Sequence, residues 1–198
     1  MGSLIHHDKK LVWIFLPKCG GTSTENYLHN LGGWTRPTIL GVDTHVKIPS
    51  GYTVFCIGRN PKDWLESGYK MLKQNDIISF SFYQHILLST SSDSLLKIVS
   101  KEGKLFDWKD YWWHCKLVPS DHIIHYTNIK IFKLENIEEF INWISIFFPN
   151  ATTQSFPHMN KTIFDPNINW TKKTLTKANI KMYKYIHQFG YSLFKENQ

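Results

Sequence analysis

Cysteine is scarce in this chain: its 198 residues include only Cys19, Cys56 and Cys115. Three scattered thiols do not make a disulfide framework and lack the spacing of a zinc site, so we expect neither a disulfide scaffold nor a bound metal. No apolar run reaches the roughly 18 residues that a membrane-spanning helix needs. The sequence also has no internal repeat and no low-complexity linker, which argues against a solenoid or a string of linked domains.

The length and the first residues bear on domain number and location. A chain of 198 residues suits one domain with a substantial core and is short for two, so residues 1–198 are predicted to form a single domain. The opening MGSLIHHDKK lacks the apolar stretch and the cleavage site of a secretory signal peptide. We therefore expect a soluble, cytoplasmic protein in which residues 1–10 are disordered or derive from a cloning tag.

The charge is unbalanced. The chain has 23 basic and 16 acidic residues, a net charge of +7. Such an excess suits a solubilising surface, and it equally suits an anionic ligand or polymer as partner. Residues 161–198 carry seven lysines against Asp165 and Glu196. Because most of these lysines fall in one predicted helix, a solvated helix face is the simplest interpretation.

Short apolar runs alternate with longer segments of helical periodicity, a pattern typical of an α/β fold with a mainly parallel sheet. The strand candidates are residues 11–16, 53–57 and 129–134, with a weaker extended segment at 123–126. Helices are predicted at residues 22–31, 61–74, 81–88, 94–100, 137–148 and 174–188. We expect Thr22 or Ser23 to cap the first helix, Pro61 to open the second and Gly190 to end the last.

The segment LVWIFLPKCGGTSTENYL, residues 11–28, joins an apolar run, a turn with two glycines and an amphipathic segment. That order predicts a strand, a phosphate-binding loop and a helix N-terminus pointing at an anion, in a P-loop-like three-layer fold. Lys18 precedes the glycines, whereas the ATP-binding pattern G-x-x-x-x-G-K-[ST] places the lysine after them. No Walker-B-type Asp follows a strong apolar strand either, so a nucleotide kinase is disfavoured.

The residue types of this loop suit an anion. Gly20 and Gly21 let the backbone approach a ligand closely and present its N–H groups. Lys18 supplies a positive charge. Thr22 and Ser23 supply hydroxyl donors. The alternative is a tight strand-to-helix turn with an exposed lysine.

A second segment, YTVFCIGRNPKDWLESGY, repeats the order of strand, turn and helix, with Arg59 at the carboxyl end of the strand. Ligands of parallel sheets bind outside these carboxyl ends, so Arg59 and Lys18 are expected to converge on one crevice. The planar guanidinium suits a second phosphate, and Ser67, about two helical turns further on, is expected to face the same crevice. The alternative is an Arg59 that pairs with Asp63 or Glu66.

Together the two segments resemble a known family. PKCGGTS at residues 17–23 and RNPKDWLESGY at 59–69 are similar to the phosphate motifs of the PAPS-dependent sulfotransferases. The likeness is strongest to the carbohydrate branch with the heparan sulfate 2-O and 6-O enzymes. Weaker matches are HMNKT at 158–162, FGY at 189–191 and KLE at 133–135, a strand ending in a glutamate. Trp64 stands where the family often has a second arginine.

The resemblance implies a co-substrate and roles for individual residues. PAPS is the expected sulfuryl donor and PAP the product, with no metal required. The loop would hold the 5′-phosphosulfate, and Arg59 with Ser67 would bind the 3′-phosphate. The residues expected to bind the co-substrate are Lys18, Cys19, Gly20, Gly21, Thr22, Ser23, Arg59, Ser67, Asn160 and Lys161.

Sulfuryl transfer also needs a base that takes a proton from the acceptor as it attacks sulfur. A histidine, with its pKa near 6.5, suits this step. His45 is the candidate, because several carbohydrate sulfotransferases carry a catalytic histidine shortly before the second motif. Lys18 is expected to stabilise the charge that builds on the leaving phosphate oxygen. The reserve histidines are His85, His114 and His158.

We therefore expect a sulfotransferase that acts on a hydroxyl or amine of a small molecule, a glycan or a protein. The aromatic-rich residues 106–114 are a candidate lining for the acceptor pocket. Neither nucleic acid nor a membrane is expected as a partner. The alternative is a non-catalytic basic module that binds PAP or another nucleotide, nucleic acid or an anionic polysaccharide.

Overall fold

The computed structural model describes residues 3–37, 48–73, 123, 126, 128–159 and 170–195. The chain divides into two compact units: residues 1–60 with 119–161, and residues 61–118 with 162–198. Each unit contains buried apolar side chains, such as Phe55 in the first and Met182 in the second. That the whole chain forms a single domain stays a prediction.

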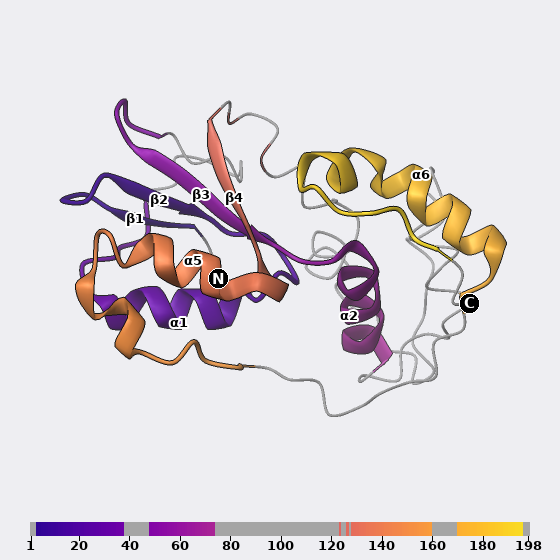
Figure 1. The fold of residues 1–198 in the computed structure, drawn as a ribbon, viewed down its shortest axis with the longest axis horizontal. Helices are drawn as coiled ribbons and strands as arrows, with labels where there is room; N and C mark the ends of the chain where they lie inside the picture. The colour runs from indigo at the N-terminus through magenta and orange to yellow at the C-terminus, as the bar shows by residue number, and fades with distance from the viewer. Residues whose placement is uncertain are drawn as a thin grey trace, which may run out of the picture. The chain divides into compact units, whose positions relative to one another are not determined.

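The first unit is built on a four-stranded sheet in the order β1-β2-β3-β4 (Figure 1). The strands are β1 (Leu4–His6), β2 (Leu11–Ile14), β3 (Thr53–Gly58) and β4 (Ile129–Lys133). β1 runs antiparallel to β2, whereas β2, β3 and β4 are parallel. The predicted α/β class and mainly parallel sheet are confirmed, and the three predicted strands differ from the observed ones by one or two residues at their ends.

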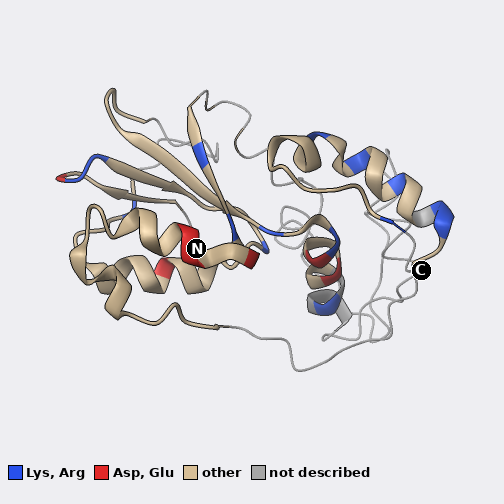
Figure 2. Cartoon of the chain, viewed as in Figure 1, with Lys and Arg blue, Asp and Glu red and all other residues tan. Residues whose placement is uncertain are grey.

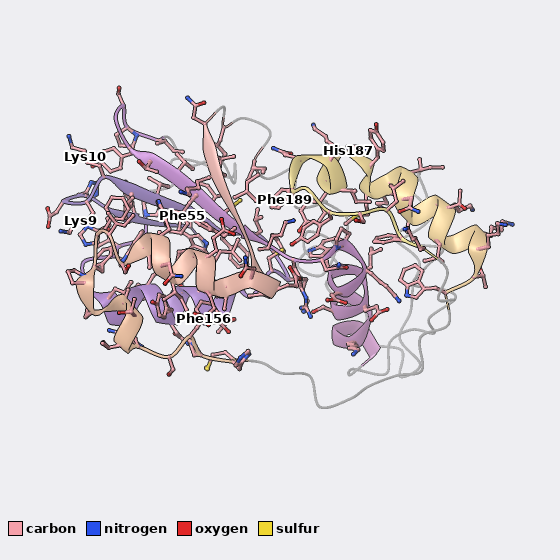
Figure 3. The ribbon with its side chains drawn as sticks, viewed as in Figure 1. Lys9, Lys10, Phe55, Phe156, His187 and Phe189 are labelled. Carbon is pink, nitrogen blue, oxygen red and sulfur yellow. The ribbon has the colours of Figure 1, made fainter. Side chains whose placement is uncertain are left out.

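Two helices, α1 (Gly21–Leu31) and α5 (Ile137–Ile144), cover one face of this sheet (Figure 1). Phe55 points from β3 toward them (Figure 3) and its ring stacks on Phe140 of α5, with 5.6 Å between the ring centroids. Trp13, Phe132 and Tyr27 belong to the same buried cluster. Since burying one large apolar side chain contributes roughly 1.5–3 kcal/mol, these aromatic residues hold helices and sheet together.

The helix predicted at residues 137–148 is shorter than expected. α5 ends at Ile144, and the 3₁₀ helices η3 (Leu134–Asn136) and η4 (Pro149–Thr153) flank it. Pro149 explains why Phe148, the last residue of the predicted helix, is not helical, because a proline disfavours helical backbone in the residue before it. Phe148 is accordingly extended, with φ −132° and ψ 93°.

The first ten residues correct one expectation. They were predicted to be disordered or derived from a cloning tag. Disorder is wrong for Leu4–His6, which form β1 with Leu4 fully buried. Ile5 pairs on its other side with Thr35, whose N–H and C=O both bond the backbone of Ile5. A three-residue strand is too short to show periodicity, and its burial comes from partners far along the chain.

The second unit contributes α2 (Pro61–Lys73) and α6 (Lys172–Gln188), close to the predicted helices. The buried side of α6 follows helical spacing through Leu175, Ala178, Met182 and Tyr185. Gly190, with φ 63°, ends the helix as predicted. Trp64 on α2 is 2% exposed and so belongs to the buried side chains of this unit.

Side-chain hydrogen bonds fix the segments that flank α6. The indole N–H of Trp170 donates to a carboxylate oxygen of Glu66 at 2.9 Å. The amide of Asn179 bonds both the N–H and the C=O of Phe194, at 2.7 and 3.1 Å. The chain after α6 is therefore held alongside the helix.

Three further secondary-structure predictions concern residues 81–88, 94–100 and 123–126. The helices predicted at residues 81–88 and 94–100 lie outside the described residues. Of the weak extended segment predicted at 123–126 the structure describes only the two end residues, and the N–H of Tyr126 donates to the carbonyl of Ile123 at 3.0 Å, a bond that a fully extended segment does not make. Among the described residues, no helix combines the length and the apolar character needed to cross a bilayer.

Candidate phosphate-binding site

The loop after β2 has an unusual backbone. Lys18 has φ 62°, a left-handed value that few residues other than glycine adopt. Gly20 is also left-handed, with φ 74° and ψ 23°, and α1 begins directly after it. Left-handed residues next to a helix N-terminus turn backbone N–H groups toward one point, an arrangement that binds anions in many proteins.

Side chains that pack against the loop explain why residues 20 and 21 are glycines. A Cβ atom on Gly20 would lie 2.9 Å from a methyl group of Leu134, which follows β4. A Cβ atom on Gly21 would overlap the ring of Phe15. The fold itself thus requires small residues here, and the same lack of side chains leaves the backbone of the loop close to any ligand.

The predicted helix cap is wrong. The N-cap of α1 is Gly20, without a side-chain cap among the described residues, and Thr22 and Ser23 lie inside the first turn. The oxygen of the buried Ser23 hydroxyl accepts a hydrogen bond of 3.0 Å from the N–H of Met159. Thr24 donates its hydroxyl to the carbonyl of Gly20 at 3.1 Å. The left-handed glycine starts the helix in place of a capping hydroxyl.

The second predicted phosphate ligand lies against this loop. Arg59 follows β3 directly, and its Nη1 donates to the backbone carbonyl of Lys18 at 3.4 Å. In a parallel sheet, β2 and β3 end at the same edge, which explains why residues 41 positions apart in the sequence meet. The structure thus brings Arg59 to the loop that carries Lys18. That both cations face one ligand-binding crevice stays a prediction.

The end of β4 joins the same edge. A carboxylate oxygen of Glu135 accepts a hydrogen bond of 2.5 Å from the N–H of Asn60, next to Arg59. Glu135 was not among the predicted site residues. The signal was present in an acidic residue that directly follows the strand predicted at residues 129–134, and in the KLE match. Glu135 thus fixes the turn that carries Arg59.

Cys19 shapes the loop from inside. Its side chain is 2% exposed, and its N–H donates to the carbonyl of Leu16 at 3.3 Å. Cys56 on β3 is fully buried, and burial, followed by the nearby Cys19, raises the pKa of its thiol well above the ordinary value. Neither thiol takes part in a disulfide bond. Buried thiols of this kind pack as small apolar groups.

The other predicted residues divide between the two units, and many of them lie in the part of the chain that the structure does not describe. Ser67 belongs to the second unit, where it is partly buried on α2. His158, a reserve histidine, is exposed next to the Met159 that bonds Ser23. The remaining candidates lie outside the described residues: His45, His85, His114, Asn160, Lys161 and residues 106–114.

The described residues contain no group of three or more His, Cys, Asp or Glu side chains arranged to hold a metal ion. Comparisons of the chain with protein-family models, with curated proteins and with solved structures found no match. The chemistry of the loop and of Arg59 is therefore the basis for a function.

Proposed function

We propose that this protein is a PAPS-dependent sulfotransferase with a P-loop-like three-layer fold. The observation that carries the proposal is the bond from Arg59 to the carbonyl of Lys18, which brings two cationic residues to one edge of a parallel sheet. PAPS has phosphate groups at two positions of one nucleoside. Two separate cations therefore suit PAPS better than they suit a ligand with a single phosphate.

The loop would bind the 5′-phosphosulfate through backbone N–H groups near Gly20 and through Lys18. Arg59 would bind the 3′-phosphate, with its turn held by Glu135. The acceptor oxygen or nitrogen attacks sulfur, and the bond from sulfur to the 5′-phosphate oxygen breaks, which releases PAP. The proton of the acceptor passes to His45 in this scheme, and Lys18 stabilises the leaving oxygen.

The direct test is calorimetric titration of the purified chain with PAP and with ATP. PAP is expected to bind and ATP to bind far more weakly. Lys18→Met and Arg59→Met are each expected to weaken PAP binding about tenfold to a hundredfold, since a hydrogen bond to a charged group contributes roughly 1.5–3 kcal/mol.

Lys10→Met is the matched control. Lys10 also has a left-handed backbone, φ 53°, but it precedes β2, at the opposite end from Lys18. It should change PAP affinity by less than about twofold, because exposed charges further apart than a Debye length are screened. Equal binding of ATP and PAP, or binding of neither, would exclude the proposal.

Activity is tested separately. Labelled PAPS is incubated with candidate hydroxyl and amine acceptors and with a His45→Ala control. Transfer that is undiminished by His45→Ala would remove that residue from the role of base. PAP binding without transfer to any acceptor would favour the non-catalytic nucleotide-binding module.

A further inference from the structure

The α6 helix has an outer face that the proposed reaction does not use. Residues 166–195 contain six lysines and no aspartate or glutamate. Figure 2 shows basic residues, coloured blue, along α6. Opposite the buried side of the helix, one line of exposed residues follows spacings of four, three, four and three positions: Lys173, Lys177, Ile180, Lys184 and His187. Such spacing puts all five on one face.

Apolar side chains stand among these cations. Ile180 is 72% exposed and Tyr183, one turn along, is 58% exposed. The ring of Tyr183 contacts that of His187, with 4.2 Å between the centroids; Figure 3 labels His187 on this helix. Leu193, 50% exposed, lies in the segment that Asn179 holds beside α6. Three of the five large apolar side chains exposed among the described residues thus belong to this one region.

We propose that the outer face of α6 binds an anionic lipid surface. Lysines attract acidic headgroups, and their long stems let the ammonium groups reach headgroups while the neighbouring side chains enter the boundary of the acyl chains. Ile and Tyr are suited to that boundary, Tyr because its ring is apolar and its hydroxyl polar. A peripheral contact of this kind needs no membrane-spanning helix.

Charge alone would also suit single-stranded nucleic acid, but the apolar residues favour lipid. Protein surfaces that bind single-stranded nucleic acid offer flat aromatic side chains on which the bases stack. Here the most exposed apolar residue is the branched Ile180, which has no ring, and Tyr183 is already in contact with His187. A bilayer accommodates both side chains.

The test is co-sedimentation of the full chain with phosphatidylcholine vesicles that contain either no phosphatidylserine or about one third phosphatidylserine. We expect binding only to the anionic vesicles, and its loss at about 1 M salt, where the Debye length is ~3 Å. Reversal of three charges, Lys173→Glu with Lys177→Glu and Lys184→Glu, should weaken binding by at least about a hundredfold, since each lysine contributes roughly fivefold.

Two controls separate this face from net charge and from general apolarity. Lys9→Glu with Lys10→Glu and Lys130→Glu changes the charge by the same amount on exposed residues of the first unit. Ile146→Ser in the first unit matches Ile180→Ser, since the two side chains are 74% and 72% exposed. Only the α6 variants should lose binding, Ile180→Ser by several-fold.

Equal losses in both triple variants, or binding that ignores lipid charge, would contradict the proposal. So would an oligonucleotide that binds the α6 face while vesicles do not. Because the assay uses neither PAP nor PAPS, its outcome is independent of the sulfotransferase proposal.

Discussion

The two ends of β2 carry the same backbone feature in different surroundings. Lys10 before the strand and Lys18 after it both have left-handed φ values, 53° and 62°. Lys10 is exposed in the turn from β1 to β2 (Figure 3), and its carbonyl accepts a hydrogen bond from the N–H of Thr53. Lys18 is only partly exposed, and its carbonyl accepts from the side chain of Arg59.

The surroundings of the two lysines account for their left-handed backbone in different ways. A hairpin turn accounts for Lys10 without reference to any ligand. At Lys18 the chain holds a lysine, and not a glycine, beside a second cation at the edge where parallel sheets bind ligands. A left-handed residue of that kind is a reason to look for function, because the structure maintains it at a cost.

The largest expected effect is on stability and concerns two glycines, Gly20 near the Lys18 end of β2 and Gly51 near the Lys10 end. Gly20→Ala combines left-handed strain of about 1–2 kcal/mol with the contact to Leu134, so we expect a loss of about 2–4 kcal/mol in the free energy of unfolding. Gly51, near the Lys10 end, has φ 81° and open space around it. Gly51→Ala should therefore lose only about 1–2 kcal/mol. Denaturant unfolding measures both, and equal losses would show that the contact with Leu134 is readily relieved.

The next effect concerns the lysines themselves. Lys18→Gly and Lys10→Gly each relieve left-handed strain, so each variant should gain about 0.5–1 kcal/mol of stability. PAP affinity should separate them: it falls in Lys18→Gly and is unchanged in Lys10→Gly. A loss of stability in Lys18→Gly would mean that the lysine side chain stabilises the fold. The left-handed backbone of Lys18 would then be no indication of a binding role.

The smallest expected effect is a pH dependence at the Lys10 end. His6 on β1 is buried, and burial lowers its pKa below the ordinary 6.5, with Lys9 acting in the same direction and Asp8 and the Gly32 carbonyl opposing. The unfolded chain then takes up the proton more readily than the folded one. The contribution of His6 to the free energy of unfolding is constant above pH 6.5. It falls as the pH drops from 6.5 through the pKa of His6 in the folded protein.

His6→Asn should therefore flatten the decline of unfolding free energy with falling pH. His7→Asn is the matched control, since the neighbouring His7 is exposed. Thermal unfolding over a pH series checks both variants. The same flattening in His7→Asn would assign the pH dependence to surface charge and not to burial.

Sequence alone predicted much of the first unit for a physical reason. Apolar runs such as residues 54–57 are buried on both faces of the sheet. Because parallel strands end at one edge, the contact of Arg59 with the backbone of Lys18 followed from this pattern. The start of α1 was missed, because no propensity shows that Gly20 is left-handed and replaces the capping hydroxyls. Glu135 was missed as well, because its partner is a backbone N–H of Asn60, 75 positions away.

The pairing of Ile5 with Thr35 has a consequence for self-association. In the antiparallel pair of β1 and β2, the backbone N–H and C=O groups of Leu4 and His6 point toward β2. Those of Ile5 point to the outer side of β1. Both of these groups are bonded to Thr35, at 2.8 and 2.9 Å. β1 thus offers no unpaired backbone group on which a strand from another molecule could add, and this edge of the sheet is protected from intermolecular pairing and aggregation.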